Sequence, residues 1–233
     1  MSALICLTYD DALPVHCEVV APLLAERGLR GTFYIPVARD DFHNHLEDWR
    51  KVAAMGHELG NHSCFHPCRT RAEWDWKPPY RLEEYTLERI RDELLMANRV
   101  LHMIDGRNER SYGATCSDLT VGNEESFVDG IRDLFPVVRS GNAEQPSIGA
   151  MPFVAPAMFV DFKRADEVIP VIESMRGQNE AWLILGMHGI GAGTHNNFMD
   201  ADEHDKLINW LAGQRNWLTS TTMLEAARSI THN

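Results

Sequence analysis

Short apolar runs alternate with segments of helical periodicity along this chain, and this alternation limits the possible folds more than any other feature. The first three apolar runs cover 4–9, 31–35 and 58–61, and predicted helices separate them at 14–27 and 46–55. Strands that alternate with helices form mainly parallel sheets, because each helix carries the chain back to the edge where the next strand starts. The sequence therefore predicts an α/β fold.

The alternation continues to the C-terminus. Further strands are expected at 112–115, 137–139, 158–162, 182–187 and 217–219, and further helices at 82–104, 126–134, 164–175, 202–213 and 222–231. Seven or eight such units suit a closed barrel better than an open sheet. Because no linker, repeat or change of composition interrupts the chain, we expect residues 1–233 to form one domain.

Charge and cysteine content exclude several classes of protein. The chain has 22 Lys+Arg against 34 Asp+Glu, a net charge of −12. This charge would repel nucleic acid and anionic membrane surfaces and favours a neutral or cationic partner.

Five cysteines form an odd and sparse set, so we expect reduced, buried thiols. With no secretory leader or membrane-spanning segment recognisable, we expect a cytoplasmic location. The sequence makes no prediction of an oligomeric state.

Polar residues capable of catalysis follow three of the predicted strands. Asp10 and Asp11 end the first strand, His62 and His66 follow the third, and His188 follows the strand at 182–187. Each feature alone has an ordinary explanation, a solvated turn for the aspartates and chance spacing or structural roles for the histidines. In barrels, however, the carboxyl ends of the strands meet at one face, which carries the active site.

Together these residue types predict metal-assisted hydrolysis. In a helical turn, histidines four residues apart project to one side, and two imidazoles with one carboxylate form a zinc-type site that keeps a position open for water. A second carboxylate could accept a proton from the water, and His188 could protonate the leaving group. On chemistry alone, either Asp10 or Asp11 could be the ligand.

Four motifs in this order resemble the polysaccharide deacetylases of carbohydrate esterase family four. They are Thr8-Tyr9-Asp10-Asp11, the strand segment 28–35, the segment 56–67 with the pattern G-H-E-x-G-N-H-S-x-x-H-P, and the late apolar strand that ends in His188. The resemblance implies a distorted (β/α) barrel, often of seven strands, that removes N- or O-linked acetyl groups from an acetylated carbohydrate. It also implies a divalent metal, usually zinc, with cobalt or nickel as alternatives.

The resemblance assigns roles by position. It implies that Asp11, His62 and His66 bind the metal, that Asp10 is the general base and that His188 is the general acid. An amidohydrolase acting on a small non-sugar substrate and a catalytically silent sugar-binding homologue remain alternative interpretations.

The third family motif is altered here. Its best match is 112–117, where Gly113 takes the place of an arginine that usually tethers the base. Either Arg110 or Arg139 could supply that charge, although each is more easily explained as a surface arginine. The backbone N–H of Cys116 is the expected oxyanion donor.

Further expectations concern the walls of the site. Gly186 replaces a leucine that usually contacts the acetyl methyl group. Asp161 is a candidate to orient His188, although it is more easily explained as a solvated aspartate. Contacts with the substrate are expected from Tyr112, Trp76 and Leu185, and packing in the core is the competing explanation for the tryptophan.

Two cysteines, Cys64 and Cys68, flank His66 in the sequence. They suggest thiolate ligands, but we disfavour this interpretation because the carboxylate and imidazole set is already complete.

Overall fold

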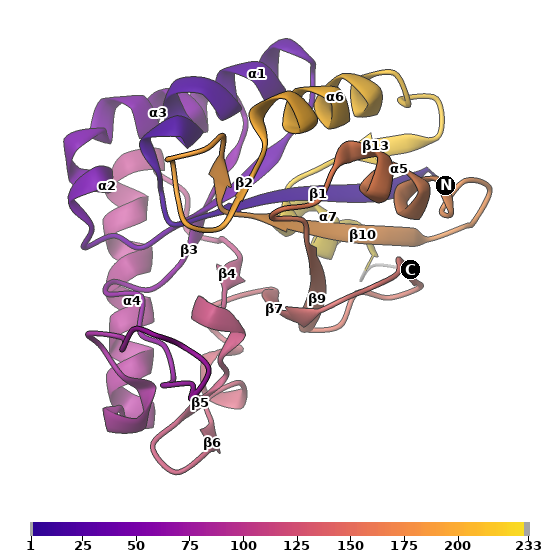
Figure 1. The fold of residues 1–233 in the computed structure, drawn as a ribbon. Coiled ribbons are helices and arrows are strands. Elements are labelled where there is room, and N and C mark those ends of the chain that lie inside the picture. Colours follow the sequence, from indigo (N-terminus) through magenta and orange to yellow (C-terminus); the bar gives the residue numbers. More distant parts are fainter. Residues whose placement is uncertain (1, 231–233) are drawn as a thin grey trace.

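Seven parallel strands close into a barrel in the computed structural model, which describes residues 2–230 (Figure 1). In barrel order the strands are β1 (Ala3–Asp10), β2 (Gly31–Ile35), β3 (Glu58–Asn61), β4 (Tyr112–Gly113), β7 (Val138–Asn142), β9 (Val154–Phe159) and β10 (Ala181–Met187). The last strand, β10, pairs with β1 and closes the ring. The predicted α/β class and the barrel of about seven strands are confirmed.

The barrel is distorted because its strand pairs differ in length. The β1–β10 pairing runs from Leu4↔Trp182 to Tyr9↔Met187, whereas β3 and β4 pair only at Asn61↔Tyr112. A register shift interrupts the pairing of β7 with β9. Two short strands extend the sheet, β13 (Leu218–Ser220) parallel to β1 and β8 (Ser147–Ile148) antiparallel to β10.

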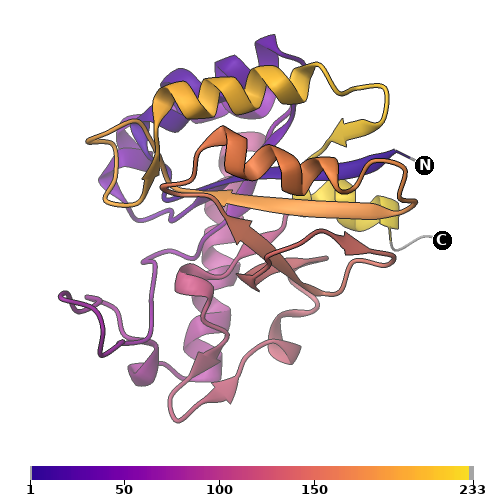
Figure 2. The same ribbon diagram turned by 45° about the vertical axis from the view of Figure 1, so that its right-hand side comes forward.

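Most of the helices cover the outside of the barrel, whereas α7 packs on its barrel side. Several lie along one side of it, as Figures 1 and 2 show, and α4 runs along another. The helices are α1 (Ala21–Glu26), α2 (Asp40–Asn44), α3 (Leu46–Ala54), α4 (Leu87–Asp105), α5 (Ala165–Glu173), α6 (Ala201–Ala212) and α7 (Met223–Ile230). Helix α4 begins at the Thr86 cap, whose side chain accepts the N–H of Arg89, and ends at Gly106 in the left-handed conformation with φ 70°.

Alternate side chains of β1 separate into two apolar clusters, as the two-residue period of a strand requires. Ile5 and Leu7 pack in the cluster that includes the outer helices, whereas Cys6 belongs to the cluster that includes α7. Asp10 lies four residues after Cys6 on β1, so the two side chains point to the same side of the strand. The side chain of Asp10 therefore lies on the barrel side of β1, away from the outer helices.

A buried glutamate anchors α7 against the start of the strands. Glu58 accepts the backbone N–H of Ser111 at 2.6 Å and that of Leu224 at 2.9 Å, and the N–H of Met223 donates to Thr32 Oγ1 at 3.0 Å. The glutamate of the G-H-E motif thus has a structural role at the end of β3 opposite to the histidines.

The segment 126–134 is not the helix that we expected. It contains part of β6 (Glu125–Ser126) and a 3-10 turn (Asp129–Ile131), and the buried rings of Phe127 and Phe135 on either side of the turn pack in one cluster with α4. The helix predicted at 82–104 is divided into a 3-10 turn (Leu82–Glu84) and α4.

Helix α2 was not predicted, and α7 is described only to Ile230, so the expected Thr231 end lies outside the described residues. Within residues 2–230, no helix has both the length and the apolar character that crossing a membrane requires.

Candidate metal centre and catalytic site

The ends of β1, β3 and β10 bring the predicted catalytic residues together. Asp10 ends β1, His62 follows β3 and His188 follows β10. Oδ2 of Asp10 lies 4.0 Å from Nε2 of His62 and 3.9 Å from Nε2 of His188. The Asp10 carboxylate therefore lies between a predicted metal ligand and the predicted general acid.

Three donor atoms beside Asp10 could hold a cation. One atom each from Asp11, His62 and His66, the metal-donor group, lie within 4.8 Å of one another, and Nε2 of His66 lies 3.2 Å from Oδ1 of Asp11. Nδ1 of His62 donates to the carbonyl of Gly113 at 2.6 Å, which leaves Nε2 unprotonated, as metal-binding histidines require. Burial lowers the pKa of His62 to about 4, so its ring is neutral at physiological pH.

A buried carboxylate oxygen that lacks a hydrogen bond supports the same assignment. Among the described residues, Oδ1 of Asp11 accepts no hydrogen bond although it is shielded from solvent. Burial opposes ionisation of this carboxyl, but the neighbouring His66, His62, His188 and Arg39 hold its pKa well below the ordinary range. An ionised carboxylate with two converging imidazoles fits a divalent cation.

The two histidines lie on a tight loop rather than on a helix. Ser63 and His66 have positive φ angles of 65° and 54°. The N–H of Ser63 donates to Oδ1 of Asn61 at 2.7 Å, and the N–H of His66 donates to Oγ of Ser63 at 2.9 Å. This turn places the imidazole centroids of His62 and His66 4.8 Å apart. Strained backbone of this kind is commonly retained at functional sites.

Glu93 supports this loop, and the sequence analysis missed it. Its Oε1 accepts the backbone N–H groups of Cys64 at 3.2 Å and Phe65 at 3.0 Å. Glu93 is buried on the face of α4 that otherwise carries Ile90, Leu94 and other apolar residues. A single acid within an apolar helix face is a signal that could have indicated a buried polar contact.

Arg139 binds the proposed base directly. Nη2 of Arg139 donates to Oδ2 of Asp10 at 2.7 Å, and Nη1 lies 3.3 Å from Oγ1 of Thr8. Burial raises the pKa of Asp10, but the charges of Arg139, His62 and His188 outweigh it and lower the pKa below its usual value. Arg139 is 1% exposed and so is not the surface arginine that we favoured from the sequence.

The other candidate, Arg110, lies elsewhere. It pairs with Asp105 at 3.1 Å and donates to the carbonyl of Leu59 at 2.7 Å. Although Arg110 is equally buried, these contacts connect the end of α4 with β3 rather than with Asp10.

Tyr34 explains why the arginine is on β7 instead of β4. Gly113 and Arg139 are paired in the register of these two strands. A Cβ atom at Gly113 would lie 2.7 Å from the Tyr34 ring, and the guanidinium of Arg139 lies 4.7 Å from the centroid of the same ring. The Tyr34 ring therefore excludes a side chain from Gly113, and the cation reaches Asp10 from the adjacent strand position.

Asp161 orients His188. Its two carboxylate oxygens accept the backbone N–H of His188 at 2.9 Å and Nδ1–H at 2.7 Å, so that Nε2 faces Asp10. Burial acts against protonation of His188, but the hydrogen bond to Asp161 and the charges of the nearby carboxylates raise its pKa to about 9. The alternative interpretation of Asp161 as a solvated turn residue is therefore wrong. His16 adds a third constraint by donating from Nε2 to the carbonyl of His188 at 2.8 Å.

Phe159 occupies the space beside Gly186. A Cβ atom at Gly186 would lie 2.7 Å from Cε1 of Phe159, and the Phe159 ring stacks on the His188 ring with centroids 5.8 Å apart. The leucine that the family usually has at this position would collide with Phe159.

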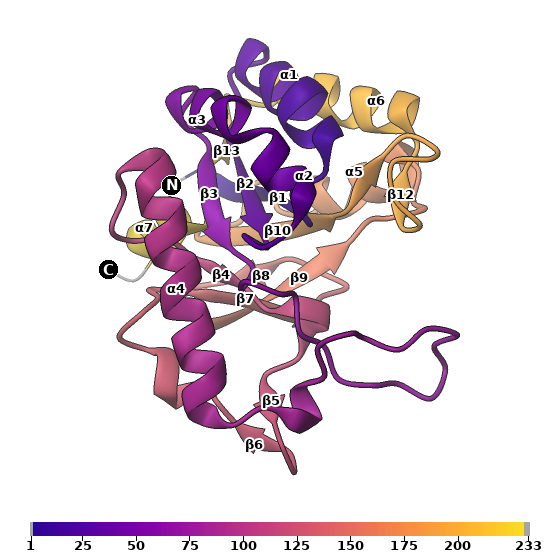
Figure 3. The same ribbon diagram turned by 90° about the vertical axis from the view of Figure 1, so that its left-hand side faces the viewer.

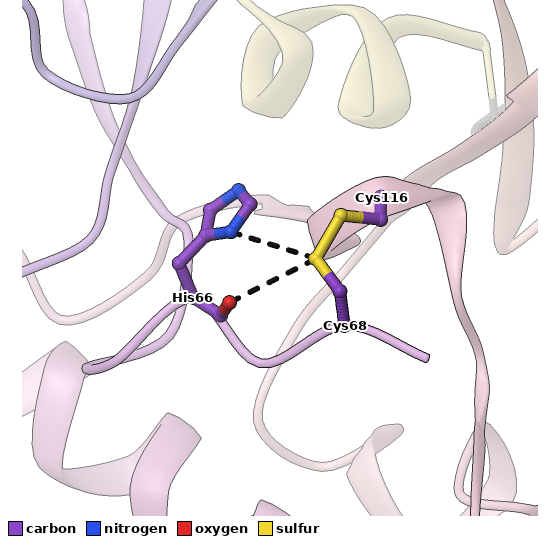
Figure 4. Close-up of side chains that lie close together, drawn as sticks. All are labelled: His66, Cys68 and Cys116. Carbon is purple, nitrogen blue, oxygen red and sulfur yellow. Dashed lines mark hydrogen bonds between the residues drawn. A yellow bond between two sulfur atoms is a disulfide. The ribbon is translucent and has the colours of Figure 1, made fainter. Parts of the chain in front are cut away.

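Two of the five cysteines are not free thiols, contrary to expectation. Cys68 and Cys116 form a disulfide beside His66, with their Cα atoms 5.7 Å apart (Figure 4). The two cysteines are 48 positions apart, and the sequence gave no indication of their pairing, because the contact depends on the adjacency of the loops after β3 and β4. Cys6, Cys17 and Cys64 are free and buried. Sγ of Cys64 contacts the carbonyl of Glu93 at 3.3 Å and lies outside the metal-donor group.

Two of the expected substrate contacts belong to the core. Tyr112 and Leu185 are both 0% exposed, the former stacked on Phe135 and the latter within the apolar layer under the outer helices, so a substrate does not reach their side chains. Trp76 is 47% exposed and stacks on Trp74, with centroids 4.8 Å apart, on the segment between β3 and α4 that extends away from the barrel in Figure 3.

The sequence matches a family model described as polysaccharide deacetylase over residues 2–120, which is 119 of the 233 residues. The chain belongs to the polysaccharide deacetylase family. The matched region contains the metal-donor group and Asp10, whereas Arg139, Asp161 and His188 lie beyond it. No curated protein matches this polysaccharide deacetylase homologue.

Solved structures of the family share its fold. The peptidoglycan deacetylase PdaC of Bacillus subtilis is 16% identical, with a TM-score of 0.61, and the match covers 99% of this chain and 92% of that one. A family 4 acetyl xylan esterase from Clostridium thermocellum, solved with a cobalt ion, is 18% identical, with a TM-score of 0.58 and coverage of 97% and 91%. BA3943, a family pseudoenzyme from Bacillus anthracis, is 14% identical, with a TM-score of 0.59 and coverage of 96% and 65%.

Proposed function

We propose that this protein is a metal-dependent hydrolase that removes N- or O-linked acetyl groups from a carbohydrate. The observation that carries the proposal is the position of Asp10, whose Oδ2 lies 4.0 Å from His62 of the metal-donor group and 3.9 Å from His188. This arrangement supports a base and an acid that both reach one acyl group bound beside the metal-donor group.

Asp11, His62 and His66 would hold the cation. A bound divalent ion supplies Lewis acidity to the acetyl carbonyl and to water. We favour zinc because two imidazoles and one carboxylate are typical of catalytic zinc sites, with cobalt or nickel as alternatives.

Asp10 is the proposed general base. Its Oδ2 is bound by Arg139, whereas its buried Oδ1 accepts no hydrogen bond from any residue within 2–230. The ion pair keeps the carboxylate ionised, so Oδ1 has lone pairs available for the proton that the attacking water loses. General-base catalysis of this kind contributes roughly 10²- to 10⁴-fold to the rate.

His188 is the proposed general acid. With a pKa raised to about 9, its ring carries both protons at physiological pH, one donated to Asp161 and one on Nε2. Nε2 can therefore give a proton to the departing nitrogen or oxygen. The hydrogen bonds that His188 donates to Asp161 fix the ring so that this proton faces the reacting group.

The proposal also assigns roles in substrate binding to the turn after β4 and to residues around the site. The N–H of Cys116, in the turn after β4, is the proposed oxyanion donor, a contribution of roughly 3 to 4 kcal/mol when one such donor is lost. Phe159 would contact the acetyl methyl group in place of leucine, and Trp76 would stack on a sugar ring. The net charge of −12 suits neutral or amine-bearing glycans.

Acetate release from a substrate panel with added zinc, cobalt or nickel tests the proposed function. The panel contains acetylated chitooligosaccharides, acetylated xylan, peptidoglycan fragments and small acetamides, with Asp10→Asn as the control for contaminating activity. Release from a glycan supports the proposal. Release from small amides alone would identify an amidohydrolase, and glycan binding without release would identify a silent homologue.

A further inference from the structure

A second set of potential metal donors lies directly beside the metal-donor group. Sγ of Cys68 lies 3.6 Å from Nδ1 of His66, as Figure 4 shows. One donor atom each from His66, Cys68 and Cys116, together called the sulfur site, lie within 4.8 Å of one another. The two sets share His66, because its Nε2 faces Asp11 whereas its Nδ1 faces the sulfur.

The sulfur site is closed to metals while the disulfide is intact. Cysteine binds metals as a thiolate, and each sulfur here is bonded to the other. In this state Cys68 can only accept a weak hydrogen bond from Nδ1–H of His66, which leaves Nε2 of His66 unprotonated toward Asp11.

Polar contacts hold the two loops together independently of the disulfide. The hydroxyl of Thr115 donates to the carbonyl of Pro67, and Arg71 donates both to the carbonyl of Cys116 and to Oδ1 of Asp118, each at 2.9 Å. The N–H of Arg69 donates to the other oxygen of Asp118 at 2.8 Å.

Two hydrogen bonds also fix the backbone of Cys68. Its N–H donates to the carbonyl of Tyr80 at 3.1 Å, and its carbonyl accepts the N–H of Leu82 at 3.0 Å. Cleavage of the S–S bond would therefore leave both loops in place, with both cysteines beside His66, and the two sulfur atoms would need only to move apart to van der Waals distance.

We propose that reduction of the Cys68–Cys116 disulfide opens a second metal site, formed by the two thiolates and Nδ1 of His66, for soft or borderline ions such as zinc, cadmium or copper(I). A dithiol reductant supplies two electrons and two protons, so its own thiols become a disulfide as the S–S bond becomes two Cys–SH groups. Binding of the ion releases the two thiol protons to solvent. Two sulfurs and one imidazole nitrogen are the ligand types that these ions prefer, and water can fill a fourth position.

The shared histidine couples the two sites. A neutral imidazole has only one unprotonated nitrogen, so His66 can serve the sulfur site through Nδ1 or the metal-donor group through Nε2, but not both. An ion at the sulfur site therefore removes one ligand from the predicted catalytic centre. This inference does not depend on the proposed deacetylase activity, because metal binding is measured directly.

A cadmium titration of the full chain in the His62→Ala background tests the proposal, because that substitution disables the metal-donor group. The ultraviolet charge-transfer absorption of cadmium thiolate reports the site, and equilibrium dialysis reports the stoichiometry. After reduction and removal of the reductant, we expect one equivalent of cadmium with thiolate absorption, and neither in the oxidised protein. Equal binding in both redox states, or no thiolate absorption after reduction, would overturn the proposal.

Matched variants assign the ligands. Cys116→Ser and, separately, Cys68→Ser should abolish the absorption of the reduced protein, whereas Cys64→Ser, which removes a nearby buried thiol outside the sulfur site, should retain it. His66→Ala should weaken cadmium binding at least tenfold while leaving both thiols present. Unchanged affinity in His66→Ala, or retained absorption in a folded Cys116→Ser or Cys68→Ser variant, would contradict the assignment; circular dichroism identifies variants that do not fold.

Discussion

Nη2 of Arg139 lies 2.7 Å from Oδ2 of Asp10, and 129 residues separate the two along the chain. Both side chains are buried, so each charge depends on the other for its stability in the interior. The pair connects β7 with the end of β1 and determines the protonation state of the proposed base.

Arg139→Gln should lower kcat by about 10²-fold and move the acidic limb of the pH–rate profile to higher pH, because it removes the largest charge that opposes the effect of burial on the pKa of Asp10. Arg139→Lys should retain part of the activity. Arg110→Gln is the matched control, because it breaks another buried arginine pair, with Asp105. It should destabilise the fold by about 3 to 5 kcal/mol and leave the acidic limb unchanged. A shift of the limb in both variants would argue against a specific role for Arg139.

The double variant His62→Ala/His66→Ala should lose about one equivalent of bound metal, since only Asp11 of the metal-donor group remains. Inductively coupled plasma mass spectrometry on protein purified with added zinc measures this loss. His43→Ala, an exposed histidine on α2, should keep its metal. Full metal content in the double variant would disprove the ligand assignment.

Asp10→Asn should keep the metal but lose about 10²- to 10⁴-fold in turnover, because an amide has no basic oxygen to accept the proton. Metal content and acetate release are measured on the same preparation. An active Asp10→Asn variant would show that another group is the base. Loss of metal instead would indicate that Asp10 contributes to ion binding.

Asp161→Asn should lower the pKa of His188 from about 9 toward its ordinary value, because the carboxylate charge and its hydrogen bond to Nδ1 are removed. Proton NMR titration of the ring measures this change directly, and the basic limb of the pH–rate profile should move to lower pH.

The pKa of His188 is raised by folding, so its contribution to stability is fully present below pH 6.5 and is lost as pH rises through about 9.

Urea unfolding of the wild type should therefore show a decrease in stability over that pH range, and Asp161→Asn should show a smaller one. An identical pH dependence in both proteins would exclude Asp161 as the source of the shift.

Gly186→Leu should destabilise the protein by about 1 to 3 kcal/mol, because the new side chain would overlap the ring of Phe159. Adding Phe159→Ala provides space for the leucine, so the double variant Gly186→Leu/Phe159→Ala should recover part of the lost stability. Thermal unfolding of the two single variants and the double variant measures the coupling between the positions. Simple additivity of the two losses would show that Phe159 does not fill the space beside Gly186.

The barrel, and the placement of Asp10, Asp11, His62, His66 and His188 at its strand ends, could be predicted from the sequence. Both signals are local: periodicity within a few residues identifies strands and helices, and a parallel barrel necessarily collects the residues at its strand ends. The same local signals failed at 126–134, where packing of Phe127 and Phe135 overrides helical periodicity.

Four features could be learned only from the folded protein. They are the arginine that binds Asp10, the orientation of His188 by Asp161, the pairing of Cys68 with Cys116, and the burial of Tyr112 and Leu185. Each of these facts depends on neighbours that are distant in the sequence. The position of Arg139 is the clearest case, because it follows from the register of β4 with β7 and from the space that the Tyr34 ring takes beside Gly113. A single sequence contains no local trace of that register, since strand pairing is fixed only when the barrel closes.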